Sequence, residues 1–144
     1  SSDLGGLVSG VATVVKALRP SVRVVGVEPE GAPKMTRSRA AGAPVTLERT
    51  HSIADGLMSI RPGDLTFAHV QALVDDLATV TDAQIAGAVR WLFEHANVVA
   101  EPSGAASVAA VLAAPAVPPG AVAVVSGGNV VAADYARYIG ATAS

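Results

Sequence analysis

The sequence predicts an α/β fold in which helices cover both faces of a mostly parallel sheet. Patterns typical of helices and of strands alternate along its 144 residues. The strand-like runs Val22–Val27 and Ala121–Val131 are rich in valine and lack polar alternation, which is typical of parallel strands buried on both faces. With 51% hydrophobic residues, the chain can bury a core, and we expect one domain over residues 1–144.

Each element is predicted from apolar spacing and from the residues that start or stop it. Because of its prolines and glycines, we expect residues 43–66 to be an irregular surface segment. Within it, a short apolar stretch precedes Asp55 and Gly56. We expect Ser103 to be the N-cap of an alanine-rich helix, and Trp91 and Phe93 to belong to the core. The remaining expected elements are a helix that starts directly behind Gly5 and Gly6 and ends before Pro20, helices Lys34–Ala41 and Leu65–Leu73, a strand Leu77–Val80, a helix opened by a capping box at Thr81, and a helix Val130–Ile139.

The composition argues against several classes of function. A net charge of −2 from 10 basic and 12 acidic residues offers no basic surface for nucleic acid. No apolar run approaches the roughly 20 residues of a membrane helix. The absence of cysteine excludes disulfides and thiolate zinc sites, and it is compatible with the cytoplasm, which we take as the expected location.

The run Ala121–Val125 ends at Ser126, Gly127, Gly128 and Asn129. In open α/β sheets, ligands bind beyond the carboxyl ends of strands, where a glycine turn lets the backbone come close to them. We therefore expect a ligand crevice here, with the Ser126 hydroxyl at its edge.

Six short motifs follow one another along the chain: GGLVSG, VVGVEPEGAPKM, SIADGL, DDLATVTDAQI, VVAEPSGAA and AVVSGGN. In this order and spacing, the chain resembles the C-terminal half of fold-type II pyridoxal-phosphate enzymes, in the branch of threonine and serine dehydratases and serine racemases. The resemblance covers nearly all 144 residues. It implies pyridoxal phosphate as cofactor and elimination of water from L-threonine or L-serine, with serine racemisation as the alternative.

The resemblance also assigns residues to the cofactor. Gly5 and Gly6 stand where family glycines cradle its phosphate, although Asp3 and Leu4 depart from the glycine run. The alternative is a plain turn before a helix, and residues 1–4 could be left from a cloning junction.

Ser126 matches the serine that meets the pyridine nitrogen, and Gly127, Gly128 and Asn129 would shape the wall beside the ring. A neutral hydroxyl does not hold that nitrogen protonated, which suits elimination. Glu101 would lie near the ring, and Asp55 with Gly56 on the substrate side. The alternatives are a capping serine, an acidic residue at a helix start and a turn aspartate.

Glu28 and the Ala32 carbonyl match ligands of a divalent cation in racemase-like members, but Lys34 stands in place of the third ligand, an aspartate. An ammonium group repels a cation, so no metal is expected. We predict an ion pair between Lys34 and Glu28 instead, with two solvated loop charges as the alternative.

The chain has two lysines, Lys16 and Lys34, and neither matches the family lysine that holds the cofactor as a Schiff base. No catalytic residue is therefore assigned, and His51, His69 and His95 lack ligand spacing. The family's N-terminal half would supply that lysine, so we expect the isolated chain to be inactive and its partner to be this missing half or a second polypeptide. A stand-alone binding or structural module, or a truncated fragment, remains the other possibility. An exposed sheet edge would favour a homo-oligomer.

Overall fold

A computed structural model describes residues 4–140. The chain divides into two compact units, one made of Ser1–Ser52 with Gly56–Thr79 and the other of Ile53–Asp55 with Val80–Ser144. Helices and a small parallel sheet confirm the predicted α/β class.

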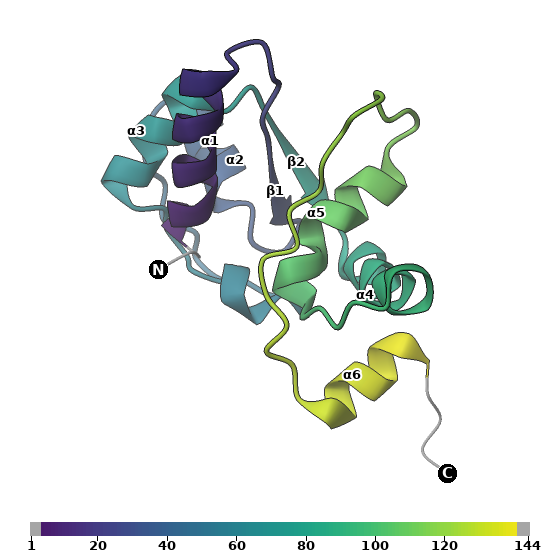
Figure 1. Ribbon diagram of the computed structural model, residues 1–144. Coiled ribbons are helices and arrows are strands. Elements are labelled where there is room, and N and C mark those ends of the chain that lie inside the picture. Colours follow the sequence, from purple (N-terminus) through teal and green to yellow (C-terminus); the bar gives the residue numbers. More distant parts are fainter. Residues whose placement is uncertain (1–3, 141–144) are drawn as a thin grey trace. The chain divides into compact units, whose positions relative to one another are not determined.

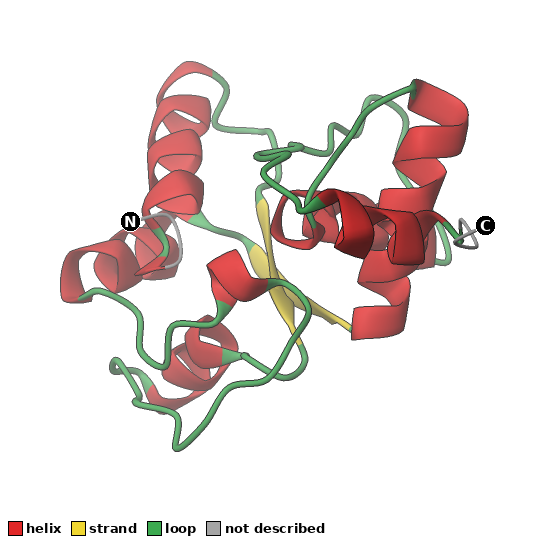
Figure 2. Ribbon diagram, turned by 90° about the horizontal axis from the view of Figure 1, so that it is seen from below, coloured by secondary structure: helices red, strands yellow, loops and turns green. Residues whose placement is uncertain are grey.

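The first unit contains the sheet, in which strands β1 and β2 lie side by side (Figure 2). Helices α1 and α3 pack against each other (Figure 1). The helix expected behind Gly5 and Gly6 ends ahead of Pro20, and the one expected after Pro33 ends at Gly42, as predicted. The elements of this unit are α1 (Gly6–Leu18), β1 (Val25–Pro29), α2 (Lys34–Ala41), the 3₁₀ turn Asp55–Leu57, α3 (Asp64–Leu73) and β2 (Asp76–Val80). The first residue of the turn, Asp55, and the last residue of β2, Val80, belong to the second unit.

Apolar side chains from α1, α2, α3 and the start of β1 form the core of the first unit. The buried members are Ala12, Val24, Met35, Phe67, Val70 and Val74. Burying a large aliphatic or aromatic side chain contributes roughly 1.5–3 kcal/mol, so these contacts are the main source of stability in the unit.

Asp75, between α3 and β2, joins β1 to the end of α1. Its carboxylate accepts hydrogen bonds from the Val24 backbone N–H at 2.6 Å and from the Lys16 ammonium at 3.0 Å. The hydrogen bond from Lys16, and to a smaller extent the one from Val24, holds the pKa of Asp75 below its ordinary value.

The second unit is built from α4 (Asp82–Ala96), α5 (Pro102–Ala113) and α6 (Ala132–Ile139), with α4 packed against both other helices. The predicted capping box is confirmed, because the Thr81 side chain accepts from the Gln84 N–H and the Gln84 side chain accepts from the Thr81 N–H. The α4 face that points inward carries Ile85, Ala88, Val89 and Leu92.

The prediction of a strand buried on both faces at Ala121–Val131 is wrong. This segment is irregular, and the side chains of Val122 and Val124 are 85% and 45% exposed. A strand requires a neighbouring strand for its ladder, and in residues 4–140 none pairs with this segment. Its backbone instead contacts α5, where the Ser107 hydroxyl donates to the Val124 carbonyl at 2.8 Å.

Three local predictions in the second unit also fail. The N-cap of α5 is Glu101, not Ser103, because Pro102 takes the first helical position, where its fixed φ suits the helix and its missing N–H costs nothing. Trp91 and Phe93 are 39% and 43% exposed and do not belong to the core. Trp91 stacks on His95, and Phe93 meets Tyr135 edge to face.

Candidate functional site

The loop Ser126–Asn129 is held against the start of α5 by Glu101. The Glu101 N–H donates to the Gly127 carbonyl at 3.1 Å. A Cβ placed on Gly127 would lie 2.0 Å from Glu101 Oε1, so the carboxylate of Glu101 lies directly against the Gly127 backbone. The structure therefore brings together two of the predicted cofactor-binding residues.

Two further glycines allow this close packing. A Cβ on Gly104 would lie 2.4 Å from the Gly127 carbonyl oxygen, and a Cβ on Gly128 would lie 2.7 Å from the Val99 carbonyl oxygen. Both obstacles are backbone atoms, which cannot move aside as a side chain can. The glycines in EPSGA and SGGN are thus required for the loop and α5 to approach each other.

Ser126 and Asn129 flank the packed glycines and are exposed. The Ser126 hydroxyl forms no hydrogen bond with any described residue. It is thus free to donate to, or accept from, a ligand, whereas a serine that capped the turn would be engaged with the backbone.

On the predicted substrate side, Asp55 lies next to the start of α5. The Ser103 hydroxyl donates to Asp55 Oδ1 at 3.4 Å. The residue that follows, Gly56, is exposed and belongs to the same 3₁₀ turn. Ser103 does not cap α5, and its hydroxyl can thus orient the carboxylate of Asp55.

In the first unit, Gly5 is the N-cap of α1 and has a φ of 99°, a left-handed conformation that favours glycine. A Cβ at Gly5 would lie 2.9 Å from the Met35 side chain. Among residues 4–140, no side chain caps α1, so the N–H groups of its first turn can bind an anion. Asp3, whose carboxylate departs from the family pattern, lies outside the described residues.

The predicted ion pair between Glu28 and Lys34 is not formed. Both carboxylate oxygens of Glu28 accept backbone hydrogen bonds at the start of α2, from the N–H of Met35 at 2.8 Å and that of Thr36 at 2.9 Å. The Lys34 ammonium donates to the Leu57 carbonyl at 2.8 Å. A carboxylate finds a better partner in two helix N-terminal N–H groups, which carry partial positive charge.

Two of the residues that shape these sites were missed by sequence reasoning. The Thr36 hydroxyl donates to Glu28 at 2.9 Å, and Thr66 lies against Gly5. No capping pattern marks Thr36, because Glu28 lies eight residues before it. No local signal marks Thr66, because its contact with Gly5 spans about sixty residues.

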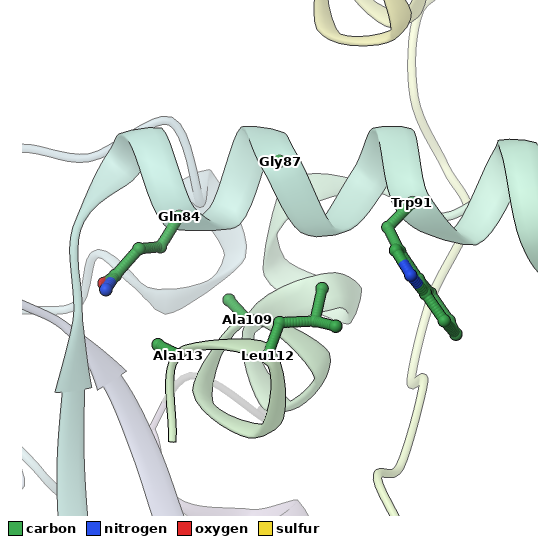
Figure 3. A pocket seen from close by; sticks show the side chains of 6 residues that line it. All are labelled: Gln84, Gly87, Trp91, Ala109, Leu112 and Ala113. Carbon is green, nitrogen blue, oxygen red and sulfur yellow. The ribbon is translucent and has the colours of Figure 1, made fainter. Parts of the chain in front are cut away.

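Each unit contains a hollow between two of its helices. One, of about 270 Å³, lies between α4 and α5 and is apolar except for Gln84 (Figure 3). The other, of about 360 Å³, lies between α1 and α3. The first is lined by Gln84, Gly87, Trp91, Ala109, Leu112 and Ala113, and the second by Gly6, Ser9, Gly10, Thr13, Val14, Leu65, Thr66 and His69. Neither contains the carboxylates or the lysines discussed above.

Within residues 4–140, no three histidine, aspartate or glutamate side chains gather as a metal would need. Over the same range, no helix has the length and apolar character required to cross a membrane.

Comparison with known proteins gives consistent matches. The family described as pyridoxal-phosphate dependent enzyme matches residues 3–127. A serine racemase of Oryza sativa subsp. indica is 47% identical over 108 residues, which are 75% of this chain and 32% of the racemase. An L-threonine ammonia-lyase of Thermotoga maritima is 44% identical over 127 residues, which are 88% of this chain and 32% of the lyase.

Among solved structures, the processed form of threonine deaminase isoform 2 from Solanum lycopersicum has a TM-score of 0.90 at 32% identity. The similarity covers 96% of this chain and 41% of the deaminase. The chain therefore spans less than half of this structure and about a third of the two sequence relatives.

Proposed function

Because this chain belongs to the family of pyridoxal-phosphate-dependent enzymes, we propose that it is part of an ammonia-lyase that eliminates water from L-threonine or L-serine. The observation that carries the proposal is the loop Ser126–Asn129, fastened to Glu101 with an exposed serine hydroxyl at its edge. The L-threonine ammonia-lyase relative, which matches 88% of this chain, supports the choice of reaction.

The described residues fit the proposed cofactor. When bound, pyridoxal phosphate supplies an electron-withdrawing ring. The Ser126 hydroxyl would form a hydrogen bond with the pyridine nitrogen, while Gly127, Gly128 and Asn129 would face the ring. Glu101 would keep this loop in place through the Gly127 carbonyl and would lie near the ring itself.

The start of α1 would bind the phosphate group. Gly5 is left-handed and has no side chain to cap the helix, so the N–H groups of the first turn can donate to phosphate oxygens. The partial positive charge at the helix N-terminus favours the same anion.

Asp55 and Gly56 would contact the amino-acid substrate. Asp55 is exposed, and the Ser103 hydroxyl donates to one of its oxygens. A carboxylate held in this way can accept a hydrogen bond from a substrate ammonium or hydroxyl group.

Both lysines of the chain are engaged elsewhere. Lys16 forms an ion pair with Asp75, with 2.7 Å between Nζ and Oδ2, and Lys34 is buried against the Leu57 carbonyl. We propose that the lysine that binds the cofactor comes from a segment outside these 144 residues or from a second polypeptide. The isolated chain is then inactive. We also propose that the protein is located in the cytoplasm.

Serine racemisation is the second candidate, supported by the 47% identity to a plant serine racemase. The two reactions share the cofactor and the substrate, and they differ in whether the β-hydroxyl leaves.

One experiment tests the cofactor residues in the chain itself. Purified protein is titrated with pyridoxal phosphate, reduced with borohydride and examined by native mass spectrometry. We expect reversible binding that Ser126→Ala weakens about threefold to tenfold, the size of one hydrogen bond, while Ser21→Ala at an exposed turn leaves it unchanged. A specific reduced adduct on Lys16 or Lys34 would show that the chain carries its own cofactor lysine.

A chimera tests the reaction. Residues 1–144 replace the matching region of the Thermotoga maritima L-threonine ammonia-lyase, and 2-oxo acid and D-serine are measured with L-threonine and L-serine as substrates. Elimination supports the lyase and accumulation of D-serine supports the racemase. A chimera that folds and binds the cofactor but catalyses neither reaction contradicts both and favours a non-catalytic module.

A further inference from the structure

The start of α2 joins two buried charges. Glu28, at 7% exposure, places its carboxylate on the N–H groups of Met35 and Thr36. Lys34, at 4% exposure, is the first residue of the same helix. The carboxylate of Glu28, from β1, thus binds the backbone of the two residues that directly follow the lysine.

The position of Lys34 is unfavourable by local rules. A cation at a helix N-terminus opposes the helix dipole, and a buried ammonium loses its hydration. Burial is compensated by a hydrogen bond of 2.8 Å from the ammonium to the Leu57 carbonyl. Leu57 ends the 3₁₀ turn Asp55–Leu57, so the lysine ties the segment that follows Gly56 to α2.

Other contacts in the first unit hold the same segment. The His51 N–H donates to the Gly31 carbonyl at 3.0 Å, and a Cβ on Gly31 would lie only 1.7 Å from the His51 carbonyl oxygen. The Thr50 hydroxyl donates to the Met58 carbonyl at 2.7 Å. His51 is therefore fastened to the turn before α2, Thr50 to Met58, and Leu57 to Lys34 through a charged hydrogen bond.

The residues do not fit the divalent cation that the family resemblance implies at this place. Mg²⁺ and Ca²⁺ require several oxygen ligands. Both Glu28 oxygens are already bound by N–H groups, the Ala32 carbonyl accepts the Lys34 N–H at 2.9 Å, and Lys34 itself brings a positive charge.

We propose that the ammonium group of Lys34 takes the place of a divalent cation. It fastens Leu57 to the start of α2, and the order of the residues beside Leu57 in the first unit is independent of divalent cations. Lys34 is thus a positioning residue for Leu57 and for Gly56 before it.

The test uses the full 144-residue chain without cofactor, so its outcome does not depend on the proposed function. Thermal unfolding of the wild type is compared in EDTA and in millimolar Mg²⁺ or Ca²⁺. We expect the same Tm in all three, because only a cation that binds the folded state would raise it. A higher Tm with either cation would overturn the proposal.

Hydrogen exchange locates the effect. In Lys34→Met, exchange of amides in residues 50–60 is expected to rise about tenfold, as the loss of one charged hydrogen bond implies. Lys34→Arg, which keeps a charged donor, should restore most of the protection. Lys16→Met is the matched control, because it removes the other lysine and should leave exchange in residues 50–60 at the wild-type level. Equal exchange in Lys34→Met and Lys16→Met would overturn the proposal.

If Lys34→Met does not fold, the cation titration of the wild type still tests the proposal, because a rise in Tm with Mg²⁺ or Ca²⁺ would overturn it.

Discussion

Glu101 and Gly127 contact each other through both backbone and side chain. The Glu101 N–H donates to the Gly127 carbonyl at 3.1 Å, and the Glu101 carboxylate occupies the space where a Cβ of residue 127 would be. Any side chain at position 127 therefore competes with Glu101. The two motifs EPSGA and SGGN, more than twenty residues apart in the sequence, act as one structural unit.

Gly104→Ala should destabilise the chain more than Gly127→Ala. A Cβ at Gly104 meets the backbone of Gly127, which must shift as a whole, at a cost of about 1–3 kcal/mol. A Cβ at Gly127 meets the end of the Glu101 side chain, which can turn away, at less than about 1 kcal/mol. Chemical denaturation of both variants gives the two free energies of unfolding.

Gly87→Ala is the control, since its Cβ meets nothing within 4 Å inside α4. Alanine favours a helix, so this variant should be as stable as the wild type or more stable by up to about 1 kcal/mol. If Gly104→Ala matched Gly87→Ala, the close packing of α5 on the loop would be disproved.

The helices followed from the sequence because their signals are local. Pro20 and Gly42 end helices at the expected places, and the capping box at Thr81 forms as predicted. The segment Ala121–Val131 failed because strand formation is not local. Its valines favour a strand, but a ladder also requires a neighbour, and a single sequence does not tell whether one is available.

The sequence suggested residues for the candidate site, which stay a prediction, but it did not predict the contacts between them. The motif SGGN drew attention to Gly127, but it did not show that the Gly127 backbone packs against Gly104. That contact depends on how α5 and the loop lie in space. Likewise, the charges of Glu28 and Lys34 suggested an ion pair, whereas the helix N-terminus offered Glu28 two backbone donors. Competition of this kind is decided by geometry.

Asp75→Asn should make stability less dependent on pH. The hydrogen bonds from Lys16 and Val24 hold the pKa of Asp75 below its ordinary value of 3.8 in the folded chain. Such a group stabilises the fold above its unfolded pKa, and the contribution is lost as the pH falls through the lower folded pKa. Between about pH 6 and about pH 3, the Tm of the wild type should fall further than that of Asp75→Asn.

The partner variant Lys16→Met checks the cause of that pH dependence. It removes the largest contribution to the lowered pKa, so its curve should approach that of Asp75→Asn. A curve parallel to the wild type would assign the acid sensitivity to other carboxylates.

Glu28→Ala should destabilise the first unit by about 2 kcal/mol or more. It leaves the N–H groups of Met35 and Thr36 buried without acceptors. Glu28→Gln keeps one acceptor oxygen and should cost about 1 kcal/mol. Urea denaturation measures both, with Glu30→Gln at an exposed site two residues away as the control, expected within about 0.5 kcal/mol of the wild type. Equal values for all three variants would mean that the Glu28 contacts do not stabilise α2.

Tyr135→Phe should leave the stability of the chain unchanged or raise it by up to about 1 kcal/mol. The Tyr135 hydroxyl is buried, has no hydrogen-bond partner among the described residues and has a pKa raised by burial. A hydroxyl that gave up water without gaining a partner costs free energy, and its removal recovers that cost. The ring still meets Phe93 edge to face at 6.0 Å, so the apolar contact is kept. Tyr138→Phe on the same helix is the matched control, and thermal unfolding of the two variants compares them. A clear loss of stability in Tyr135→Phe alone would reveal a partner for this hydroxyl, such as a bound water.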